Sequence, residues 1–529
     1  MNARQHILRS VVGEIPRLLS LLDRSKTSAT YGCFDRNYWQ YKIVDFPSAR
    51  CQEAALTLAL LYNLKSKENP YYHQSNIMEW INAALRFWQM MQNKNGSFNE
   101  WYPNEHSFVA TAFSTYAVTE TLLELGNVEG SIIKSIKKSA SWMMKHSEMK
   151  VLNQQAGSAI ALYNSYLTTK EEKFKRGAEK KIDAILASQT NEGWWYEYEG
   201  PDIGYLSLMI DYLSKYYSKS RDKRVLAAIK RAASFLKYFI HPDGTVGGCY
   251  ASRNTKYLMP GGFYSISGQC IDAADICFML DKGLGISLPT FDDRYLTYIA
   301  YNWLQAFKNY RKCKGSLPQH SLKKTFPLAG IVVWSTPDFY LIVNASKGGS
   351  FSLFTKKNAF SESGIIQSTG NFFLSSGRIS LQNKIIEDNN ALKIKACFFP
   401  LKPNLMDTKK LIALRAFQLT LGKSGCINKA VKGILRGMLI SKKGSGRFKL
   451  NREITLNSHA TIIDRIELHP KAKEIFLGQE FSELYVPSSQ YFHIQELQNR
   501  GFKIKVNGRK DIKVIRQISK SGVVSVKVI

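Results

Sequence analysis

The sequence has no long apolar run. None of its apolar stretches reaches the roughly 18 residues that a membrane-spanning helix needs. Its first residues, MNARQHILRSVVGEIPRLLSLLDRS, mix charged and apolar positions and contain neither an uninterrupted apolar stretch nor a small-residue cleavage site, so we identify no signal peptide. We therefore expect a cytoplasmic protein, either free or peripheral at the inner face of the membrane.

Cysteine is scarce. Eight cysteines are scattered over 529 residues, without CxxC spacing or a dense framework. This distribution fits reduced thiols, and it argues against a zinc ribbon and against a disulfide scaffold.

Acidic residues are scarce in the second part of the chain. Residues 1–300 carry 35 Lys and Arg against 29 Asp and Glu, whereas residues 301–529 carry 38 against 13, and the whole chain has a net charge of +31. A basic surface attracts polyanions, so the partners we expect are an acidic polysaccharide, a lipid-linked glycan or an anionic membrane surface. A solvated basic surface without a partner is the alternative. We expect no nucleic acid partner, because no recognised nucleic-acid-binding motif accompanies the charge.

The first 310 residues or so show the three-to-four spacing of helices that bury one face. Windows at 77–92, 107–125, 178–189 and 224–240 have this spacing. Several of these helices end in a glycine-containing turn, as in QNKNGSFNEW, QTNEGWWYEY and HPDGTVGGCY. The turns and the small-residue helix starts recur at about 50 residues, which predicts stacked helical hairpins in an α/α toroid or solenoid. The long loops then converge at one end and form a cleft.

From about Ser321 the pattern changes to short segments rich in β-branched and aromatic residues, broken by Gly, Asn, Ser and Pro. Examples are GRFKLNREITLNSHATIIDRIEL, YFHIQEL and the closing KIKVNGRKDIKVIRQISKSGVVSVKVI. These segments predict antiparallel strands. We therefore expect an α+β multidomain protein, with an α/α toroid in residues 1–315 that contains the catalytic cleft and a strongly basic antiparallel β-sandwich in residues 316–529.

Two expected loops of the toroid carry polar groups. SFNEWYPNEHSF, residues 97–108, combines Tyr102, Asn104 and His106 in front of an inner helix. The alternative to a functional role for this loop is a structural one, as a helix cap with a packed aromatic side chain. YASRNTKYLMPGGFY, residues 250–264, supplies Arg253, Asn254 and Tyr257, which could grip a carboxylate.

The stretch NEGWWYEYEGPDIGYLSLMIDYL, residues 191–213, is the richest of these loops. Trp195 offers a stacking surface for a sugar or a wall for the core. Glu197 and Glu199 form a possible carboxylate pair, although alternate residues of an extended segment point to opposite sides. Tyr205 follows a glycine at a probable helix start. A fourth loop, TYGCFDRNYWQYK, places Arg36 where it could close the far side of the cleft, or where it serves only the structure.

These motifs resemble those of heparinase II/III-type and related alginate lyases. NEGWWYEYEGPDIGYLSLMIDYL resembles their glycine turn, Glu and helix-starting Tyr, YPNEHSF resembles their Asn-then-His loop, and FPLAGIVVWSTPDFYLIVNASKGG is similar to the first strands of their β-domain. The resemblance implies a polysaccharide lyase in which Tyr205 is the catalytic tyrosine. It further implies that Asn104 and His106 neutralise the substrate carboxylate and assist proton abstraction.

One departure concerns histidine. The family carries a histidine-rich patch after the first β-domain strands, with a catalytic histidine and often a metal site. This sequence reads SKGGSFSLFTKKNAFSESG there and has no histidine between His320 and His459. We therefore expect no zinc and no other cofactor, with Lys347 or Lys356 in that space.

The function that we expect is carbohydrate-active: C5 proton abstraction and β-elimination on a uronate-containing polysaccharide or surface glycan. Uronyl C5-epimerisation begins with the same abstraction. A glycoside hydrolase that uses two of Glu100, Glu197 and Glu199 remains open, as does a glycan-binding protein without activity. Terpenoid cyclases share the Gln-to-Gly-aromatic repeats, but no Asp-rich protonating motif is present. The absence of a signal peptide favours a role in capsule or surface-glycan synthesis.

Overall fold

We analysed a computed structural model of the chain. It describes residues 3–126, 130–282, 292–316, 321–387, 390–401, 407–424, 446–481, 494–497, 501–506 and 508–529, together with residues 427, 430–431 and 433–434. Everything below concerns these residues.

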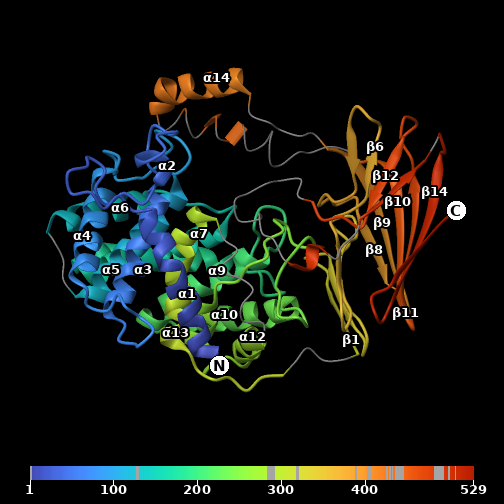
Figure 1. Ribbon diagram of the computed structural model, residues 1–529, viewed down its shortest axis with the longest axis horizontal. Helices are drawn as coiled ribbons and strands as arrows, with labels where there is room; N and C mark the ends of the chain where they lie inside the picture. Colours follow the sequence, from blue (N-terminus) through green and yellow to red (C-terminus); the bar gives the residue numbers. More distant parts are fainter. Residues whose placement is uncertain are drawn as a thin grey trace.

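Helical hairpins make up the first half of the chain (Figure 1), and their contacts close them into a ring. Within the described residues, six inner helices each pack against the next, and the last packs against the first. They are α3 (Ala54–Asn63), α5 (Phe108–Leu125), α7 (Leu152–Thr169), α9 (Ile203–Ser220), α11 (Pro260–Ile266) and α13 (Asp293–Asn309). The outer helices are α1 (Ala3–Ser20), α4 (Ser75–Met90), α6 (Gly130–Lys145), α8 (Glu172–Ala187), α10 (Lys223–Leu236) and α12 (Ile271–Lys282). The predicted toroid is confirmed.

Burial distinguishes the two layers of the ring. The inner helix α9 is buried almost continuously from Ile203 to Tyr217. The outer helix α10 buries only one face, which contains Val225, Ala228, Ile229 and Ala232. This difference explains why three of the four periodic windows, 77–92, 178–189 and 224–240, fall on outer helices, whereas 107–125 falls on the inner helix α5.

The recurring Gln and Gly residues connect neighbouring hairpins. In three repeats a glutamine side-chain amide donates to the carbonyl of a turn glycine and to a carbonyl of a neighbouring outer helix: Gln52 to Gly32 and Ala84, Gln92 to Gly96 and Ser135, and Gln189 to Gly193 and Ala228. Gly193 has a φ of +97°, and a Cβ there would lie 2.3 Å from the carbonyl oxygen of Arg231. Only glycine therefore allows this close packing.

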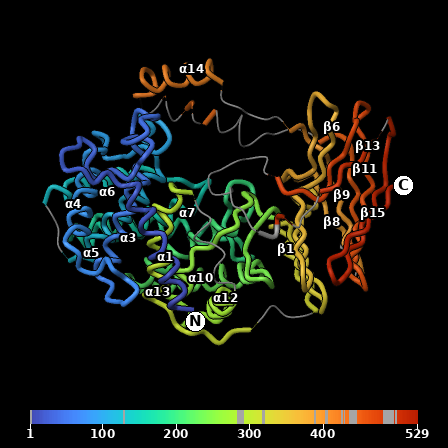
Figure 2. Tube along the Cα trace, viewed as in Figure 1, coloured from blue at the N-terminus to red at the C-terminus, as the bar shows by residue number. Residues whose placement is uncertain are grey.

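Two antiparallel sheets make up the second half (Figure 2). The first sheet contains, in order, β1 (Leu322–Phe326), β2 (Ile331–Ser335), β3 (Tyr340–Asn344), β4 (Ser350–Phe354) and β5 (Ala359–Glu362). The second has the order β13-β12-β6-β7-β9-β10-β11-β14-β15, with β8 paired to β9. Its strands are β6 (Ile366–Ser368), β7 (Phe373–Ser375), β8 (Lys384–Glu387), β9 (Leu392–Leu401), β10 (Arg447–Leu456), β11 (His459–Glu467), β12 (Glu474–Leu477), β13 (Phe502–Lys505), β14 (Asp511–Ser519) and β15 (Val524–Val528).

The first sheet lies between the helical ring and the second sheet. Ile342 and Phe354 belong to the hydrophobic core of the ring. Their neighbours Leu341 and Leu353 belong to the core that the first sheet shares with Ile454 and other residues of the second sheet. Because successive strand residues point to opposite faces, this sheet is buried on both sides, and the predicted β-sandwich is confirmed.

A charge network is buried between the two sheets. Arg452 and Arg516 both bind the carboxylates of Glu362 and Asp464, with distances of 2.5–2.6 Å for the closest contacts. All four side chains are at most 4% exposed. Buried charges require such pairing, because isolated charges in a protein interior are strongly destabilising.

Two elements of the second half differ from the strands expected there. Helix α14 (Thr408–Leu419) lies between β9 and β10, beginning after Asp407, whose side chain accepts the backbone N–H of Lys410 at 2.8 Å. The strand expected at YFHIQEL is wrong for Ile494–Leu497, which form a 3-10 turn, while residues 491–493 lie outside the described residues. The expected boundary between residues 315 and 316 falls between the end of α13 and the start of β1. No helix among those described is long and apolar enough to cross a bilayer.

Candidate active site at the mouth of the helical ring

The N-terminal ends of the inner helices meet at one end of the ring, which we call the mouth. Arg294, at the start of α13, lies 3.1 Å from Ser48, just before the helical turn that leads into α3. The backbone N–H of Asn153, in α7, donates at 3.1 Å to Glu197, which precedes α9. Since the N-terminal ends of helices carry partial positive charge, the mouth favours negatively charged ligands.

Asp202 holds the start of α9 and the loop at 253–255 together. Its carboxylate accepts the backbone N–H groups of Tyr205 at 3.2 Å and Arg253 at 3.0 Å, and it also accepts the hydroxyl of Thr255. Asp202 is completely buried, and burial raises the pKa of its carboxyl although these hydrogen bonds oppose the shift. Asp202 therefore fixes the backbone on which Tyr205 and Arg253 stand.

Tyr205, the predicted catalytic tyrosine, is partly exposed at this end of α9. Gly204 directly before it permits close packing, because a Cβ there would lie 2.6 Å from the hydroxyl oxygen of Thr255. Next to Tyr205 stands Tyr257, which is 1% exposed. Burial, together with the neighbouring phenols of Tyr295 and Tyr205, raises the pKa of Tyr257 well above its ordinary value. Tyr257 is therefore a neutral phenol in the wall of the mouth.

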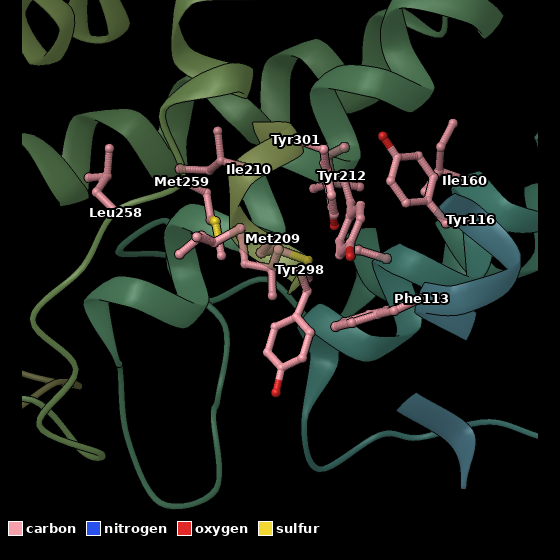
Figure 3. Close-up of a cluster of buried hydrophobic side chains, with 14 of the residues drawn as sticks. Phe113, Tyr116, Ile160, Met209, Ile210, Tyr212, Leu258, Met259, Tyr298 and Tyr301 are labelled. Atoms are coloured by element: carbon pink, nitrogen blue, oxygen red, sulfur yellow. The ribbon is translucent and has the colours of Figure 1, made fainter. Parts of the chain in front are cut away.

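A row of tyrosines continues from Tyr257 along α13. The hydroxyl of Tyr295 donates to that of Tyr257 at 3.4 Å, and the Tyr295 and Tyr298 rings are 5.1 Å apart. Figure 3 shows Tyr298 and Tyr301 of α13 beside Tyr212 of α9 and Phe113 of α5. This aromatic cluster fills the centre of the ring beneath the mouth.

Two arginines lie at the edge of this aromatic cluster. The Arg50 guanidinium is 4.1 Å from the centre of the Tyr298 ring. The Arg294 guanidinium is 3.8 Å from the centre of the Trp101 ring and 3.5 Å from a carboxylate oxygen of Glu100. Arg50 is 12% exposed and Arg294 26%. Arg294 is therefore the arginine that a ligand in the mouth would reach.

The loop at 97–108 carries the predicted Tyr102, Asn104 and His106, all partly buried. Nδ1 of His106 lies 2.7 Å from the hydroxyl of Ser97. The side-chain amide of Asn104 donates to the carbonyl of Gln418 in α14 at 3.1 Å. Through Glu100, Arg294 and the tyrosine row, the structure connects this loop with the Tyr205 loop.

Two predicted site residues of the aromatic loop before Tyr205 are buried. Trp195 is 1% exposed and its indole N–H donates to the carbonyl of Ile185 at 2.8 Å. The expectation that Trp195 stacks on a sugar is therefore wrong, because its ring forms part of the core. Glu197 is also 1% exposed, and burial raises its pKa well above the ordinary value. One carboxylate oxygen, Oε2, has no hydrogen-bond partner among the described residues. Burial therefore favours the neutral, protonated form of Glu197.

Arg253 and Glu199 form a pair beside Glu197. The guanidinium of Arg253 lies 3.7 Å from the centre of the Tyr198 ring and 3.8 Å from Glu199, which is 37% exposed. Nε and Nη2 of Arg253 have no hydrogen-bond partner among the described residues, and the residue is 2% exposed. Of the expected carboxylate pair, only Glu199 reaches solvent.

The predicted Asn254 joins the ring to the first sheet. Its side-chain oxygen accepts Nζ of Lys347 at 2.5 Å, and its amide donates to the carbonyl of Phe481 at 3.2 Å. Lys347 is 6% exposed and also donates to the carbonyl of Ala251. Of the two lysines considered for the missing histidine, Lys347 thus contacts the mouth loop, whereas Lys356 is 72% exposed and pairs with Asp338.

Arg36 contacts its own neighbours. In α2 (Arg36–Trp39) it donates to Gln40 at 2.5 Å and stacks on Tyr41. No group of three or more His, Cys, Asp and Glu side chains among the described residues could hold a metal ion.

Sequence reasoning missed Arg50, Arg294, Tyr295 and Tyr298 because it concentrated on loops. A signal was present in DRYLTYIAY, where Arg294, Tyr295, Tyr298 and Tyr301 share one face of a helix. An arginine at the start of such an aromatic face marks a helix whose N-terminal end opens into a site.

No protein-family model matches the chain, and no curated protein matches it by sequence. Solved structures do match. The chain aligns with a Paenibacillus xanthan lyase at a TM-score of 0.53 and 9% identity, over 98% of this chain and 54% of that one. Two other matches are a Streptomyces coelicolor A3 chondroitin AC lyase mutant (TM-score 0.49, 8% identity, 90% and 68% coverage) and a Pedobacter heparinus heparan sulfate lyase mutant (TM-score 0.44, 10% identity, 88% and 70% coverage).

These matches concern the fold. The chain spans about half the length of the xanthan lyase chain. Over almost all of its own length it is similar to that lyase in its helical ring and following sheets. The chain therefore shares the fold of that xanthan lyase, and the fold expected from the resemblance, a toroid followed by antiparallel sheets, is confirmed.

Proposed function

We propose that this protein is a glycan-processing enzyme that binds a uronate-containing polysaccharide or lipid-linked glycan at the mouth and cleaves it by β-elimination. The observation that carries the proposal is the position of Tyr205. It is a partly exposed phenol at the N-terminal end of an inner helix, fixed by Asp202 and next to the tyrosine row that ends at Arg294. The polysaccharide lyase fold supports the same assignment.

The substrate carboxylate is the group that the mouth has to stabilise. When a base removes the C5 proton of a uronate, negative charge develops on that carboxylate. Arg294 is a partly exposed guanidinium at the mouth, and Asn104 and His106 supply an amide and an imidazole. These donors and the converging helix N-termini favour the additional negative charge of the transition state over the single charge of the substrate carboxylate in the ground state.

Tyr205 carries the proton in this mechanism. Its phenolate takes the C5 proton, the C5–H electrons form the C4=C5 double bond, and the C4–O bond breaks toward the leaving sugar. The phenol then returns its proton to the leaving oxygen. An ordinary tyrosine pKa lies near 10, so this step requires a cation beside the bound carboxylate, and Arg294 is the candidate.

The test is incubation of the protein with a panel of uronate polymers in deuterated water. Absorbance of an unsaturated product and deuterium at C5 are measured together. New absorbance is the expected result. Deuterium incorporation without chain cleavage would indicate a C5-epimerase with the same base, and saturated reducing ends would indicate a hydrolase. Binding without any of these signals overturns the enzymatic proposal and leaves a glycan-binding protein.

A further inference from the structure

Helix α14 forms one side of a surface that combines exposed apolar side chains with lysines. Leu411, Ile412, Leu419 and Leu421 are 49%, 64%, 47% and 61% exposed. Lys409, Lys410 and Lys423 lie on the same short segment and are exposed as well. Single exposed apolar residues are ordinary, but four within eleven positions of a chain segment are an exposed patch that requires an explanation.

The patch continues onto the ring, next to α2. Arg415 of α14 forms a 3.0 Å ion pair with Asp45. Just before Asp45 in the chain, Tyr41 and Ile43 are 54% and 71% exposed, and Lys42 between them is exposed too. Figure 1 shows α14 above α2, at the edge of the helical ring. We call these two segments, residues 41–43 and 409–423, the arm patch.

The charge of the arm patch has one sign. Its nearest acidic residues are already paired, Asp45 with Arg415 and Asp407 with Lys410. Within residues 407–424, the sequence carries four Lys and Arg and a single acidic residue, Asp407. The patch therefore presents an uncompensated positive charge around its apolar side chains.

We propose that the arm patch binds the surface of an anionic lipid bilayer. The free energy falls when Leu and Ile side chains move from water to the boundary of the acyl chains. Lysines beside them are attracted by anionic headgroups. A hydrated polysaccharide would use the lysines but would leave Ile412 and Leu421 in water, so the bilayer accounts for both features. The proposal deepens the proposed function, because α14 also holds Asn104 through Gln418 and thus brings the mouth near a membrane-anchored glycan.

The experiment is flotation of the full chain with vesicles, without any glycan. Vesicles of phosphatidylcholine alone are compared with vesicles that also contain phosphatidylglycerol. We expect binding to the anionic vesicles, weaker binding as salt rises, and little binding to the neutral ones. The double variants Ile412→Ser with Leu421→Ser, and Lys409→Glu with Lys423→Glu, should each weaken vesicle binding by about tenfold or more.

Matched controls change exposed apolar residues elsewhere. Ile271 and Val523 are 81% and 68% exposed, in α12 and in the turn before β15. Replacing both by Ser should leave vesicle binding unchanged. An equal loss of vesicle binding in the control and arm variants would overturn the assignment to the arm patch. Equal binding to vesicles with and without anionic lipid would overturn it as well. Retention on an immobilised polyanion without vesicle binding would point to a polysaccharide instead. The flotation experiment contains no glycan, so absence of vesicle binding would not bear on the lyase proposal, which the incubation with uronate polymers tests.

Discussion

Nζ of Lys347, in the turn between β3 and β4, donates to the side-chain oxygen of Asn254 at a distance of 2.5 Å. The same ammonium donates to the carbonyl of Ala251. A buried lysine of the first sheet thus holds the loop that carries Arg253. Residues of both halves of the chain therefore position the mouth.

Replacing Lys347 by Met should therefore loosen this loop. The carbonyl of Ala251 and the amide oxygen of Asn254 would lose a charged donor, at a cost in the free energy of unfolding of about 1–3 kcal/mol. Thermal unfolding measures this loss, and glycan cleavage should fall with it. Lys356→Met is the control, because Lys356 is 72% exposed and its ion pair with Asp338 contributes little. Equal stability of the two variants would contradict the role given to Lys347.

Glu197 distinguishes elimination from hydrolysis. It is buried, and burial raises its pKa well above the ordinary value, which favours the neutral carboxyl that Gln mimics. Elimination by Tyr205 predicts that this variant keeps most of its activity. A hydrolase that uses Glu197 as its acid predicts a loss of about 100-fold or more.

The same variant tests the charge state through the pH dependence of stability. Above the ordinary pKa of Glu, the unfolded chain releases the Glu197 proton while the folded protein retains it. Stability therefore falls as pH rises through this range, and Glu197→Gln should remove that part of the slope. An unchanged slope in chemical denaturation across neutral pH would show that Glu197 is ionised in the fold.

The helical ring could be predicted because its physical cause repeats in the sequence. Outer helices such as α10 bury one face and so show periodic apolar residues, while Gly96 and Gly193 occupy turns that only glycine fits. The first sheet was predictable for a similar reason, since it is buried on both faces and reads as nearly continuous apolar strands. Helix α14 was missed because none of its apolar residues is buried, so its sequence lacks the pattern of a buried face.

The site was only partly predictable. Tyr205 and the loop of His106 were found because a glycine turn and a helix start mark them locally. The direction in which the Trp195 side chain points could not be predicted in the same way, since an aromatic residue after a glycine turn faces either the core or the cleft. Arg294 reaches Glu100 across nearly two hundred residues, and only the closure of the ring brings them together.

Arg294 should be required for turnover more than for folding. It is partly exposed beside Trp101 and Glu100, where it would stabilise the substrate carboxylate. Arg294→Gln is expected to lower kcat/KM by about 100-fold, a loss typical of one removed transition-state donor. Arg224→Gln is the control, because Arg224 is 61% exposed and far along the chain in α10. Similar kinetics for the two variants would remove Arg294 from the mechanism.

The buried charges of the second half predict its response to acid. Burial alone would raise the pKa of Glu362, but Arg452 and Arg516 lower it from 4.5 to about 2. The stability that this group contributes is therefore present above pH 4.5 and is lost as pH falls toward 2, by about 3 kcal/mol. Acid titration of the unfolding free energy measures it.

Glu362→Gln tests the same network at neutral pH. It leaves two buried guanidinium groups with one carboxylate fewer, which should destabilise the protein by about 3–5 kcal/mol. Glu453→Gln, next to Arg452 on β10, breaks only a partly exposed 3.8 Å pair with Arg465 and should cost less than about 1 kcal/mol. Equal effects would mean that the buried network is not ionised as the structure indicates.

The most direct measurement compares Tyr205→Phe with Tyr196→Phe on a uronate polymer that the protein cleaves, in deuterated water. Tyr196 lies on the same loop and is 45% exposed, so its loss controls for removal of any phenol near the mouth. Proton transfer by Tyr205 predicts that Tyr205→Phe forms the unsaturated product at least about 100-fold more slowly and incorporates no C5 deuterium into the uncleaved polymer, while it still binds the polymer and Tyr196→Phe remains active. Unsaturated product formed by Tyr205→Phe at the rate of the unchanged protein would contradict the central claim.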